Sequence, residues 1–317
     1  MVNLVFLDQE TLPPQAHLRR PEFAHHWQSY DDTLPEQVQA RLAEADIVLV
    51  NKVTLTAQML TTLPRLKLIA LAATGSDNVD LEACRQAGIA VCNVRNYSKS
   101  SVPEHALSLM MALNRSLHAY RNSITEGRWQ QSGQFCYFDY PVRDLAGQTL
   151  GLIGYGTIAK DLEKMAQALG MKVIVAARKG QAPTEGRVRF EYLLENADVI
   201  SLHCPLNDDT HHLIAEPEFK LMKDDALLIN VGRGGLVDEA ALLLALEHQQ
   251  IGGAGFDVVT AEPPAADNPL MHALAYPNFI LTPHVAWASR ASMQRLADQL
   301  IDNIEAFVAG KEQNRLV

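Results

Sequence analysis

The sequence predicts an α/β protein of two domains, in which a doubly wound parallel sheet interrupts a smaller α/β domain. Short apolar strand patterns alternate with helix patterns along almost the whole chain, which is typical of parallel sheets flanked by helices. A glycine-rich turn at residues 154–159 comes only near the middle of the chain, so the residues before it belong to another unit. The last helix pattern, residues 293–308, has no place in a completed second unit and is expected to return to the first.

Apolar runs in the first unit predict strands at residues 4–7, 47–50, 66–72 and 89–92. Between the last two strands, a helix begins near Asp80 and stops at Gly88. We assign residues 1–98 and 287–317 to this smaller domain and residues 99–286 to the second domain.

The second domain opens on a helix that links the two. The run Ser101-Val102-Pro103-Glu104 predicts a capping box with proline in the first turn. One stripe of this helix is apolar and contains Ala106, Leu109, Met110, Leu113 and Leu117. Residues 119–147 are less regular and rich in aromatic side chains. They form either a packed loop or an arm that buries its aromatic rings against a second subunit, as in a homodimer.

Further apolar runs predict the strands of the second sheet at residues 150–153, 172–176, 199–202, 226–231, 254–258 and 279–281. A helix with a continuous apolar face follows the first of these strands and stops at Gly170. Another helix, residues 239–248, lies between the strands at 226–231 and 254–258.

The turn after the strand at 150–153 is suited to a phosphate group. Gly154 permits a tight turn, Gly156 lets the backbone approach a pyrophosphate, and Ala159 keeps the helix close to the strand. The helix that follows directs free N–H groups, including those of Thr157 and Ile158, toward the anion. Strand, turn, helix and second strand follow in the required order, which predicts a dinucleotide-binding unit. The alternative is a glycine-rich turn in another kind of α/β protein.

Charge and cysteine content argue against several classes of protein. The net charge is −10, from 27 basic and 37 acidic residues, so neither nucleic acid nor an anionic membrane is an expected partner. The four cysteines lie far apart, and neither a signal peptide nor a membrane-spanning stretch is visible, which favours a cytoplasmic protein. Two groups of histidines lack the usual spacing of metal ligands: His25 with His26, and His203, His211 and His212 with Cys204.

Three polar residues follow consecutive strands of the second sheet. Arg233 follows 226–231, Glu262 follows 254–258 and His284 follows 279–281. Each alone is more often a solvated loop residue. Ligands of parallel sheets bind beyond the carboxyl ends of the strands, so together these three predict a site with a cation, a carboxylate and an imidazole.

Seven segments, in order, resemble the D-isomer-specific 2-hydroxyacid dehydrogenases, and within them the glyoxylate and hydroxypyruvate reductases (glycerate dehydrogenases). They are ATGSDNVD, SSVPEHAL, GLIGYGTIAK, LHCPLNDDT, INVGRGGLVDEAAL, GAGFDVVTAEPP and LTPHVAWAS. The resemblance covers essentially the whole chain. It implies an NAD(P)-dependent oxidoreductase with a Rossmann-type sheet inserted into a flavodoxin-like substrate domain.

The resemblance also implies roles for individual residues. Reduction of a 2-oxo acid needs hydride at the carbonyl carbon and a proton on its oxygen, and His284 is the expected general acid. Arg233 is expected to hold the carboxylate and polarise the carbonyl, and Glu262 to orient the imidazole and favour its charged form. The expected substrate contacts are Asn51, Gly75, Ser76, Arg233 and Trp287. Trp287 either lines the pocket, which favours short substrates, or only packs at the domain junction.

The expected cofactor contacts are Val102, Gly154, Gly156, Thr157, Ile158, Arg178, Lys179, Cys204, Pro205, Thr210, Val231, Gly232, Arg233, Asp257 and His284. Among these, Asp257 resembles the residue that accepts a hydrogen bond from the nicotinamide amide. The end of the second strand, where NAD enzymes usually have an acidic residue, is Ala177, followed by Arg178 and Lys179. Without the repulsion of a carboxylate, these cations favour NADP over NAD, unless they are simply solvated charges.

Two other functions stay open on the sequence. One is a dehydrogenase for another 2-hydroxy acid, of the lactate or branched type. The other is a non-catalytic regulator of the same fold that senses the cofactor.

Overall fold

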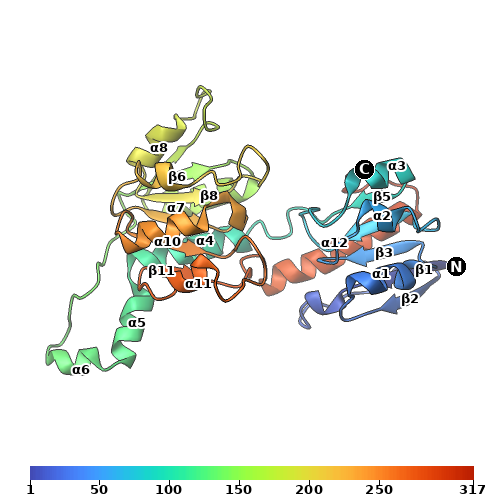
Figure 1. The fold of residues 1–317 in the computed structure, drawn as a ribbon, viewed down its shortest axis with the longest axis horizontal. Coiled ribbons are helices and arrows are strands. Elements are labelled where there is room, and N and C mark those ends of the chain that lie inside the picture. The colour runs from blue at the N-terminus through green and yellow to red at the C-terminus, as the bar shows by residue number, and fades with distance from the viewer. The chain divides into compact units, whose positions relative to one another are not determined.

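The computed structural model describes all 317 residues and divides the chain into two compact units. The first unit comprises residues 1–98 and 288–317, and the second comprises residues 99–287. Each unit holds one parallel sheet with helices on both faces (Figure 1). The expected α/β class is therefore confirmed. Trp287, which we expected in the smaller domain, belongs to the second unit.

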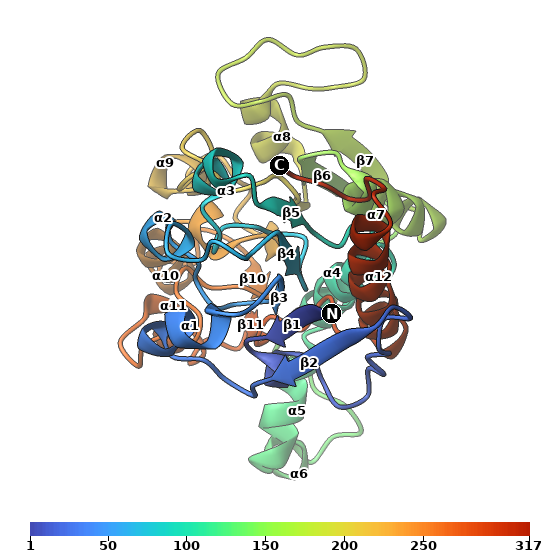
Figure 2. The same cartoon turned by 90° about the vertical axis from the view of Figure 1, so that its right-hand side faces the viewer.

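The sheet of the first unit has five parallel strands in the flavodoxin-like order β2-β1-β3-β4-β5. The strands are β1 (Val2–Phe6), β2 (His25–Ser29), β3 (Ile47–Val50), β4 (Leu68–Leu71) and β5 (Ala90–Cys92). Helices α1 (Pro35–Leu42), α2 (Ala57–Leu60) and α3 (Leu81–Ala87) cover one face, and α12 (Arg290–Val308) covers the other (Figure 2). The last helix thus returns to the first unit, as its lack of a partner in the second sheet predicted.

The edge strand β2 was missed by the sequence analysis. Its residues, HHWQS, alternate between exposed and half-buried positions, whereas every residue of β3 and β4 is buried. An edge strand with one wet face lacks the continuous apolar run that marks a central parallel strand. His25 and His26, which we expected to be surface residues without a site, lie on this strand.

The second sheet has six parallel strands in the order β11-β10-β9-β8-β6-β7. They are β6 (Thr149–Ile153), β7 (Lys172–Val175), β8 (Val199–Leu202), β9 (Leu227–Asn230), β10 (Gly253–Phe256) and β11 (Phe279–Leu281). Beyond β7, Val188 pairs with Ala176 through a single parallel bridge. With this bridge as the outermost position, the order is that of the Rossmann fold with β11 added at the opposite edge, and it reverses between β6 and β8.

Helices on both faces of the second sheet bury two apolar layers. One layer is formed mainly by α4 (Ser101–Asn114) and α7 (Thr157–Ala168). The other is formed by α8 (Phe190–Asn196), α9 (Glu216–Phe219), α10 (Glu239–Glu247) and α11 (Pro269–Ala273). No helix of the chain has the length and apolar character needed to cross a bilayer.

The start of α4 differs from the predicted capping box. Ser101 is already helical, the capping position is Ser100, and no side chain caps the helix. The Ser101 hydroxyl instead donates a hydrogen bond to the carbonyl of Ala286. The end also differs, because the chain turns at Ser116 with a φ of 49°. Leu117 therefore leaves the predicted stripe, opens helix α5 (Leu117–Thr125) and is 58% exposed.

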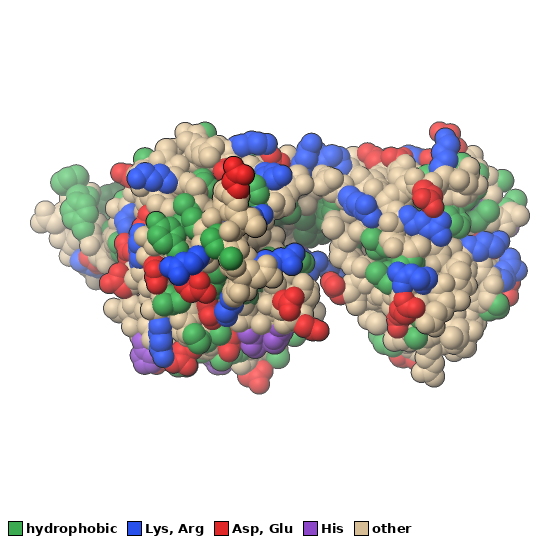
Figure 3. All heavy atoms as spheres, turned by 90° about the horizontal axis from the view of Figure 1, so that it is seen from above, with side chains coloured by type: hydrophobic (Ala, Val, Ile, Leu, Met, Phe, Trp, Pro, Cys, Tyr) green, Lys and Arg blue, Asp and Glu red, His purple; other side chains and the backbone are tan.

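Most of residues 119–147 form a projecting arm, and its burial against a second subunit stays a prediction. Helices α5 and α6 (Arg128–Ser132) project from the body of the second unit, and the following segment runs back to it (Figure 1). The rings of Tyr120, Tyr137 and Tyr140 pack edge to face within the arm. Phe135 and Phe138 are 88% and 85% exposed, and apolar side chains gather where the arm ends (Figure 3).

Candidate active site

Three neighbouring strands of the second sheet end at the same edge. Strand β10 pairs in parallel with β9 on one side and with β11 on the other. The loops after β9, β10 and β11 carry Arg233, Glu262 and His284 respectively. The sheet therefore places these three predicted residues on adjacent loops.

His284 and Glu262 are in direct contact. His284 Nδ1 lies 2.6 Å from Glu262 Oε2, and both side chains are about one-third exposed, at 30% and 34%. The other carboxylate oxygen of Glu262 accepts a hydrogen bond from the Val259 N–H at 3.2 Å. Because Nδ1 is engaged by the carboxylate, the proton that Nε2 can carry is free to be transferred to a reacting group.

The loop that carries Arg233 is fixed by its own backbone. Buried Asn230 donates to the carbonyl of Arg233 at 2.9 Å and accepts from the Gly232 N–H at 3.1 Å. Arg233 Nη1 donates to the carbonyl of Gly232 at 2.9 Å. At Gly234, a Cβ atom would lie 2.0 Å from the backbone of Val259, so only glycine lets this loop pack against the one that leads to Glu262.

His284 has a left-handed backbone, with a φ of 54°. Its N–H donates to the carbonyls of Asp257 and Thr282 at 2.8 and 3.0 Å. Its own carbonyl accepts from the indole N–H of Trp287 at 2.9 Å. A non-glycine residue in this region costs free energy and persists only where its surroundings hold it.

Asp257 stabilises this conformation of the loop that carries His284. Its side chain is 1% exposed, and its carboxylate accepts from the N–H groups of Val285 and Ala286 at 2.9 and 2.8 Å. The hydroxyl of Thr282 is a third donor, at 2.5 Å. Asp257 thus anchors the loop that carries His284, and its contact with a nicotinamide amide stays a prediction.

The glycines of the phosphate turn have different surroundings. Gly154 has a φ of 88°, and a Cβ atom there would lie 2.5 Å from the backbone of His203 and Cys204. At Gly156 a Cβ atom would meet nothing within 4 Å. Gly156 is also the capping position of α7, where no side chain occupies the helix N-terminus. The open space at uncapped N–H groups fits a pyrophosphate.

The other predicted cofactor contacts of the second unit lie near the same edge. Thr157 and Ile158 form the first turn of α7, and Val102 lies in the first turn of α4. The loop after β8 is closed by a hydrogen bond of 2.7 Å from the Thr210 hydroxyl to the Pro205 carbonyl. The remaining residues follow β8 and β9 directly: Cys204, Val231 and Gly232.

The two cations after β7 are not equivalent. Lys179 Nζ lies 2.8 Å from Glu218 Oε1, and the Glu218 side chain is only 8% exposed. Lys179 is 43% exposed, and its ammonium group pairs with this buried carboxylate. Arg178 is exposed and forms no ion pair, and Ala177 before it is buried.

In the first unit, the predicted substrate residues lie on two linked loops. Asn51 follows β3, and Gly75 and Ser76 follow β4. The carboxylate of Asp8, at the end of β1, accepts from the N–H groups of residues 51–53 at 2.6 to 3.1 Å. Burial raises the pKa of this carboxyl, against the lowering effect of those hydrogen bonds. Asn78 joins the two loops by donating to the carbonyl of Val53 at 2.9 Å.

Comparison with known proteins identifies the family. The sequence model of one protein family, described as the NAD binding domain of D-isomer specific 2-hydroxyacid dehydrogenases, matches residues 107–286. The chain belongs to this family. It is 53% identical to a glycerate dehydrogenase of Methylorubrum extorquens, over 98% of both chains. It is 36% identical to a hydroxypyruvate reductase of Blautia hydrogenotrophica, over 88% of this chain and 87% of the other.

A solved structure of similar fold is that of an acyclic imino acid reductase in complex with NADPH and D-Arg. It is 30% identical, with a TM-score of 0.83 over the full length of both chains. The family resemblance of the sequence motifs and the assignment to the 2-hydroxyacid dehydrogenases are therefore confirmed.

Several residues that organise the site of this dehydrogenase were missed by the sequence analysis. Asp8 and Thr282 lie within two residues of the ends of β1 and β11, so the rule that identified Arg233 could have found them. His105 lies within an apolar helix pattern and gave no such signal. Its contact with Thr282, at 2.9 Å, joins residues 177 positions apart.

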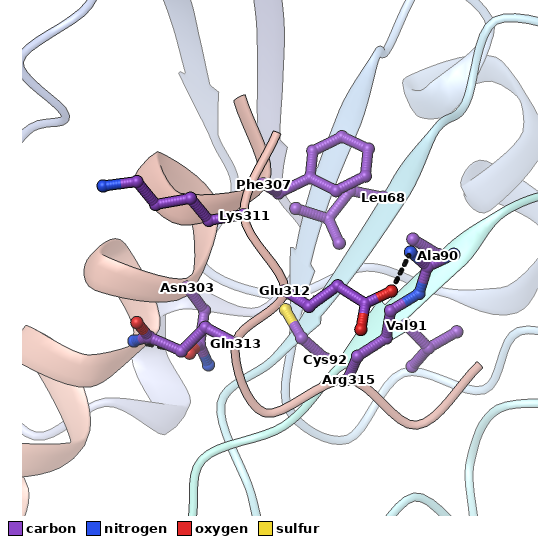
Figure 4. Close-up of a pocket in the computed structure, with 10 residues that line it drawn as sticks. All are labelled: Leu68, Ala90, Val91, Cys92, Asn303, Phe307, Lys311, Glu312, Gln313 and Arg315. Carbon is purple, nitrogen blue, oxygen red and sulfur yellow. Dashed lines mark hydrogen bonds and ion pairs between the residues drawn. The ribbon is translucent and has the colours of Figure 1, made fainter. Parts of the chain in front are cut away.

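A surface hollow of the dehydrogenase lies elsewhere, in the first unit, between β4, β5 and the C-terminal segment (Figure 4). Leu68, Cys92, Phe307 and Arg315 are among its lining residues, and none of the predicted site residues is. Burial raises the pKa of the Cys92 thiol to about 12, so the thiol stays protonated and unreactive at neutral pH.

The histidines near the phosphate turn have partners within the protein. His203 Nε2 lies 2.9 Å from the Ser201 hydroxyl. The rings of His211 and His212 stack with their centroids 3.9 Å apart. No three His, Cys, Asp or Glu side chains lie close enough together to hold a metal ion.

Proposed function

We propose that this chain reduces short 2-oxo acids, such as hydroxypyruvate and glyoxylate, to the D-2-hydroxy acids with a nicotinamide dinucleotide. The contact of 2.6 Å between His284 and Glu262, on a loop adjacent to that of Arg233, carries the proposal. The names of the two curated relatives support the choice of substrate. In this proposal residues 99–287 form the dinucleotide-binding domain, and residues 1–98 with 288–317 the substrate-binding domain.

The residues divide the chemistry between them. A reduced nicotinamide, when bound, supplies the hydride. The planar guanidinium of Arg233 can hold the substrate carboxylate with two parallel hydrogen bonds. His284 donates the proton from Nε2 to the carbonyl oxygen. Glu262, opposite Nδ1, keeps the ring oriented and stabilises the imidazolium before transfer.

Trp287 supports a preference for short substrates. Its indole N–H is engaged by the carbonyl of His284 at 2.9 Å, and its ring packs against the apolar layer of α4 and α7. Because the hydrogen bond and the packing fix the position of this bulky ring, it cannot move aside to make room for a long or branched substrate. For Asn51, Gly75 and Ser76 we propose contacts with the substrate carboxylate, through the backbone N–H groups of the last two.

Steady-state assays with a panel of 2-oxo acids test the proposal. We expect the highest kcat/KM for hydroxypyruvate or glyoxylate, lower values for pyruvate and the lowest for branched acids. A preference for pyruvate or a branched acid would support the lactate or branched alternative instead. Cofactor binding without turnover of any 2-oxo acid would indicate the non-catalytic regulator.

For the cofactor we propose a preference for NADP over NAD. The buried Ala177 brings no carboxylate to the end of β7, and the exposed Arg178 is available to a 2′-phosphate. Lys179 already pairs with Glu218, so its contribution is expected to be smaller. Arg178→Ala should reduce the ratio of kcat/KM for NADPH to that for NADH about tenfold or more, whereas Lys179→Ala should change it little. Strong NADH preference in the unmodified protein would contradict the proposal.

We also propose that the chain forms a homodimer through residues 119–147. The two most exposed phenylalanines of the arm, at 88% and 85%, support this, because a monomer gains nothing by exposing them. Phe135→Ser combined with Phe138→Ser should convert a dimer to a monomer in analytical ultracentrifugation. Leu244→Ser is the control, because Leu244 is also exposed, at 51%, but lies on α10.

For the location of the protein we propose the cytoplasm, and the four free cysteines support this.

A further inference from the structure

A chain of three side chains lies behind the loop that carries His284. His105 on α4 is 21% exposed, and its Nε2 lies 2.9 Å from the hydroxyl of Thr282. Thr282 follows β11, and its hydroxyl lies 2.5 Å from Asp257 Oδ1. Asp257 in turn holds the N–H groups of Val285 and Ala286.

The proton positions along this chain follow from the partners. The carboxylate of Asp257 only accepts, so the single hydroxyl hydrogen of Thr282 points toward it. The same hydroxyl must then accept from His105, which fixes the proton of the imidazole on Nε2. The two hydrogen bonds therefore point in one direction. His105 on α4 donates to the hydroxyl of Thr282, and that hydroxyl donates to the buried carboxylate of Asp257.

The anchored loop needs this support, because its conformation is costly. His284 has a φ of 54°, in a region that non-glycine residues rarely adopt. The two N–H groups held by Asp257 follow His284 immediately. If the carboxylate turned away, those donors would lose their partner and His284 could relax toward a commoner conformation, away from Glu262.

We propose that His105 and Thr282 are positioning residues for the reduction. They hold the carboxylate of Asp257 in the orientation that keeps His284 in its left-handed conformation and in contact with Glu262. This inference rests on the proposed function for its kinetic consequences, but its structural part does not. Neither residue touches a reacting atom.

Two variants of Thr282 separate the hydroxyl from the volume of the side chain. Thr282→Val keeps the shape and removes the hydrogen bonds of the hydroxyl, including those to His105 and Asp257, so kcat should fall about tenfold or more. KM for the 2-oxo acid should stay within about twofold, because Arg233 and the loops of the first unit remain. Thr282→Ser keeps the hydroxyl and should restore kcat to within about twofold of the unmodified enzyme. Equal losses in both variants would overturn the proposal.

Two variants of His105 test the other end of the chain. Glutamine can offer an N–H donor near the position of Nε2, whereas leucine cannot. His105→Leu should lower kcat in the same direction as Thr282→Val, and His105→Gln should recover most of the loss. The combined loss in the double variant with Thr282→Val should be smaller than the product of the two single losses, because both substitutions break one chain and His105 otherwise keeps only a contact of 3.6 Å with Asp257 Oδ1. Additive losses would show that the two residues act separately, which would overturn the inference.

Amide hydrogen exchange gives a readout that does not depend on turnover. The N–H groups of Val285 and Ala286 should exchange at least about tenfold faster in Thr282→Val than in the unmodified protein or in Thr282→Ser. Exchange that is unchanged in Thr282→Val would overturn the inference, whatever the activity. Faster exchange in a protein that reduces no 2-oxo acid would support the positioning of the loop and overturn the proposed function.

Discussion

Glu262 and His284 depend on each other at the scale of single residues. Glu262 is held at both carboxylate oxygens, by Val259 N–H and by His284 Nδ1. The imidazole is therefore fixed in orientation while its other nitrogen can exchange a proton. An exposed histidine without such a partner would rotate freely and lose more entropy on reaching a productive geometry.

Removal of the imidazole tests the general acid. His284→Ala should lower kcat by roughly 10² to 10⁴, as expected for the loss of a positioned proton donor. His272→Ala is a suitable control, because His272 is exposed on α11, outside the loops of the site. Steady-state kinetics with hydroxypyruvate check the prediction, and wild-type kcat in His284→Ala would remove His284 from the mechanism.

Replacement of Arg233 by lysine tests the planar fork rather than the charge. A lysine keeps one positive charge but cannot form two parallel hydrogen bonds to a carboxylate. We expect kcat/KM of Arg233→Lys to fall roughly 10-fold to 100-fold, which corresponds to about 1.5 to 3 kcal/mol for a hydrogen bond to a charged group. A matched measurement with Arg233→Ala should give a larger loss. Equal activity of lysine and arginine would mean that charge alone suffices.

At the scale of elements, the phosphate turn joins β6 to α7 with two glycines of different purpose. Gly154 serves the fold, because it has a φ of 88° and lies against the backbone of His203 and Cys204. Gly156 has open space where a side chain would lie. Substitution of each by alanine should therefore separate folding from cofactor binding.

We expect Gly154→Ala to lower the melting temperature, because a Cβ atom would lie 2.5 Å from main-chain atoms. Gly156→Ala should leave the melting temperature of the free protein nearly unchanged and weaken dinucleotide binding about tenfold or more, because the methyl group occupies the space at the helix N-terminus. Thermal denaturation and calorimetric titration with NADPH check the pair. If both variants bound the cofactor normally, this turn would not be the phosphate site.

At the scale of the whole molecule, stability should depend on pH through His203. Burial lowers the pKa of this histidine from its ordinary value of 6.5 to about 4. Between these values the unfolded chain binds a proton that the folded protein excludes, so stability falls as pH decreases from 6.5 to about 4. Asp8 acts oppositely: burial raises its pKa, so below that value protonation of its carboxyl favours the folded state.

Thermal unfolding at a series of pH values isolates the histidine. His203→Gln keeps a polar group near Ser201 without a titrating ring, so its melting temperature should decline less between pH 6.5 and 4 than that of the unmodified protein. His248→Gln, at an exposed position, is the control and should follow the unmodified protein. Parallel curves for both variants and the unmodified protein would exclude His203 as the source.

The sequence by itself determined the class of fold, the central strands and the polar residues at their ends. Buried parallel strands need continuous apolar runs, so β3 and β8 were predicted with their observed bounds. Helix α3 likewise begins after Asp80 and ends before Gly88, because capping is a local interaction between neighbouring residues.

Only the tertiary structure decided which side chains support the site. The exposed edge strand β2, the pairing of Lys179 with Glu218 and the chain from His105 to Asp257 all depend on residues distant in sequence. Local patterns report the burial of a position and not the identity of its partner. The role of a buried carboxylate such as Asp257 therefore becomes clear only from the structure, which shows that it accepts hydrogen bonds from the N–H groups of Val285 and Ala286.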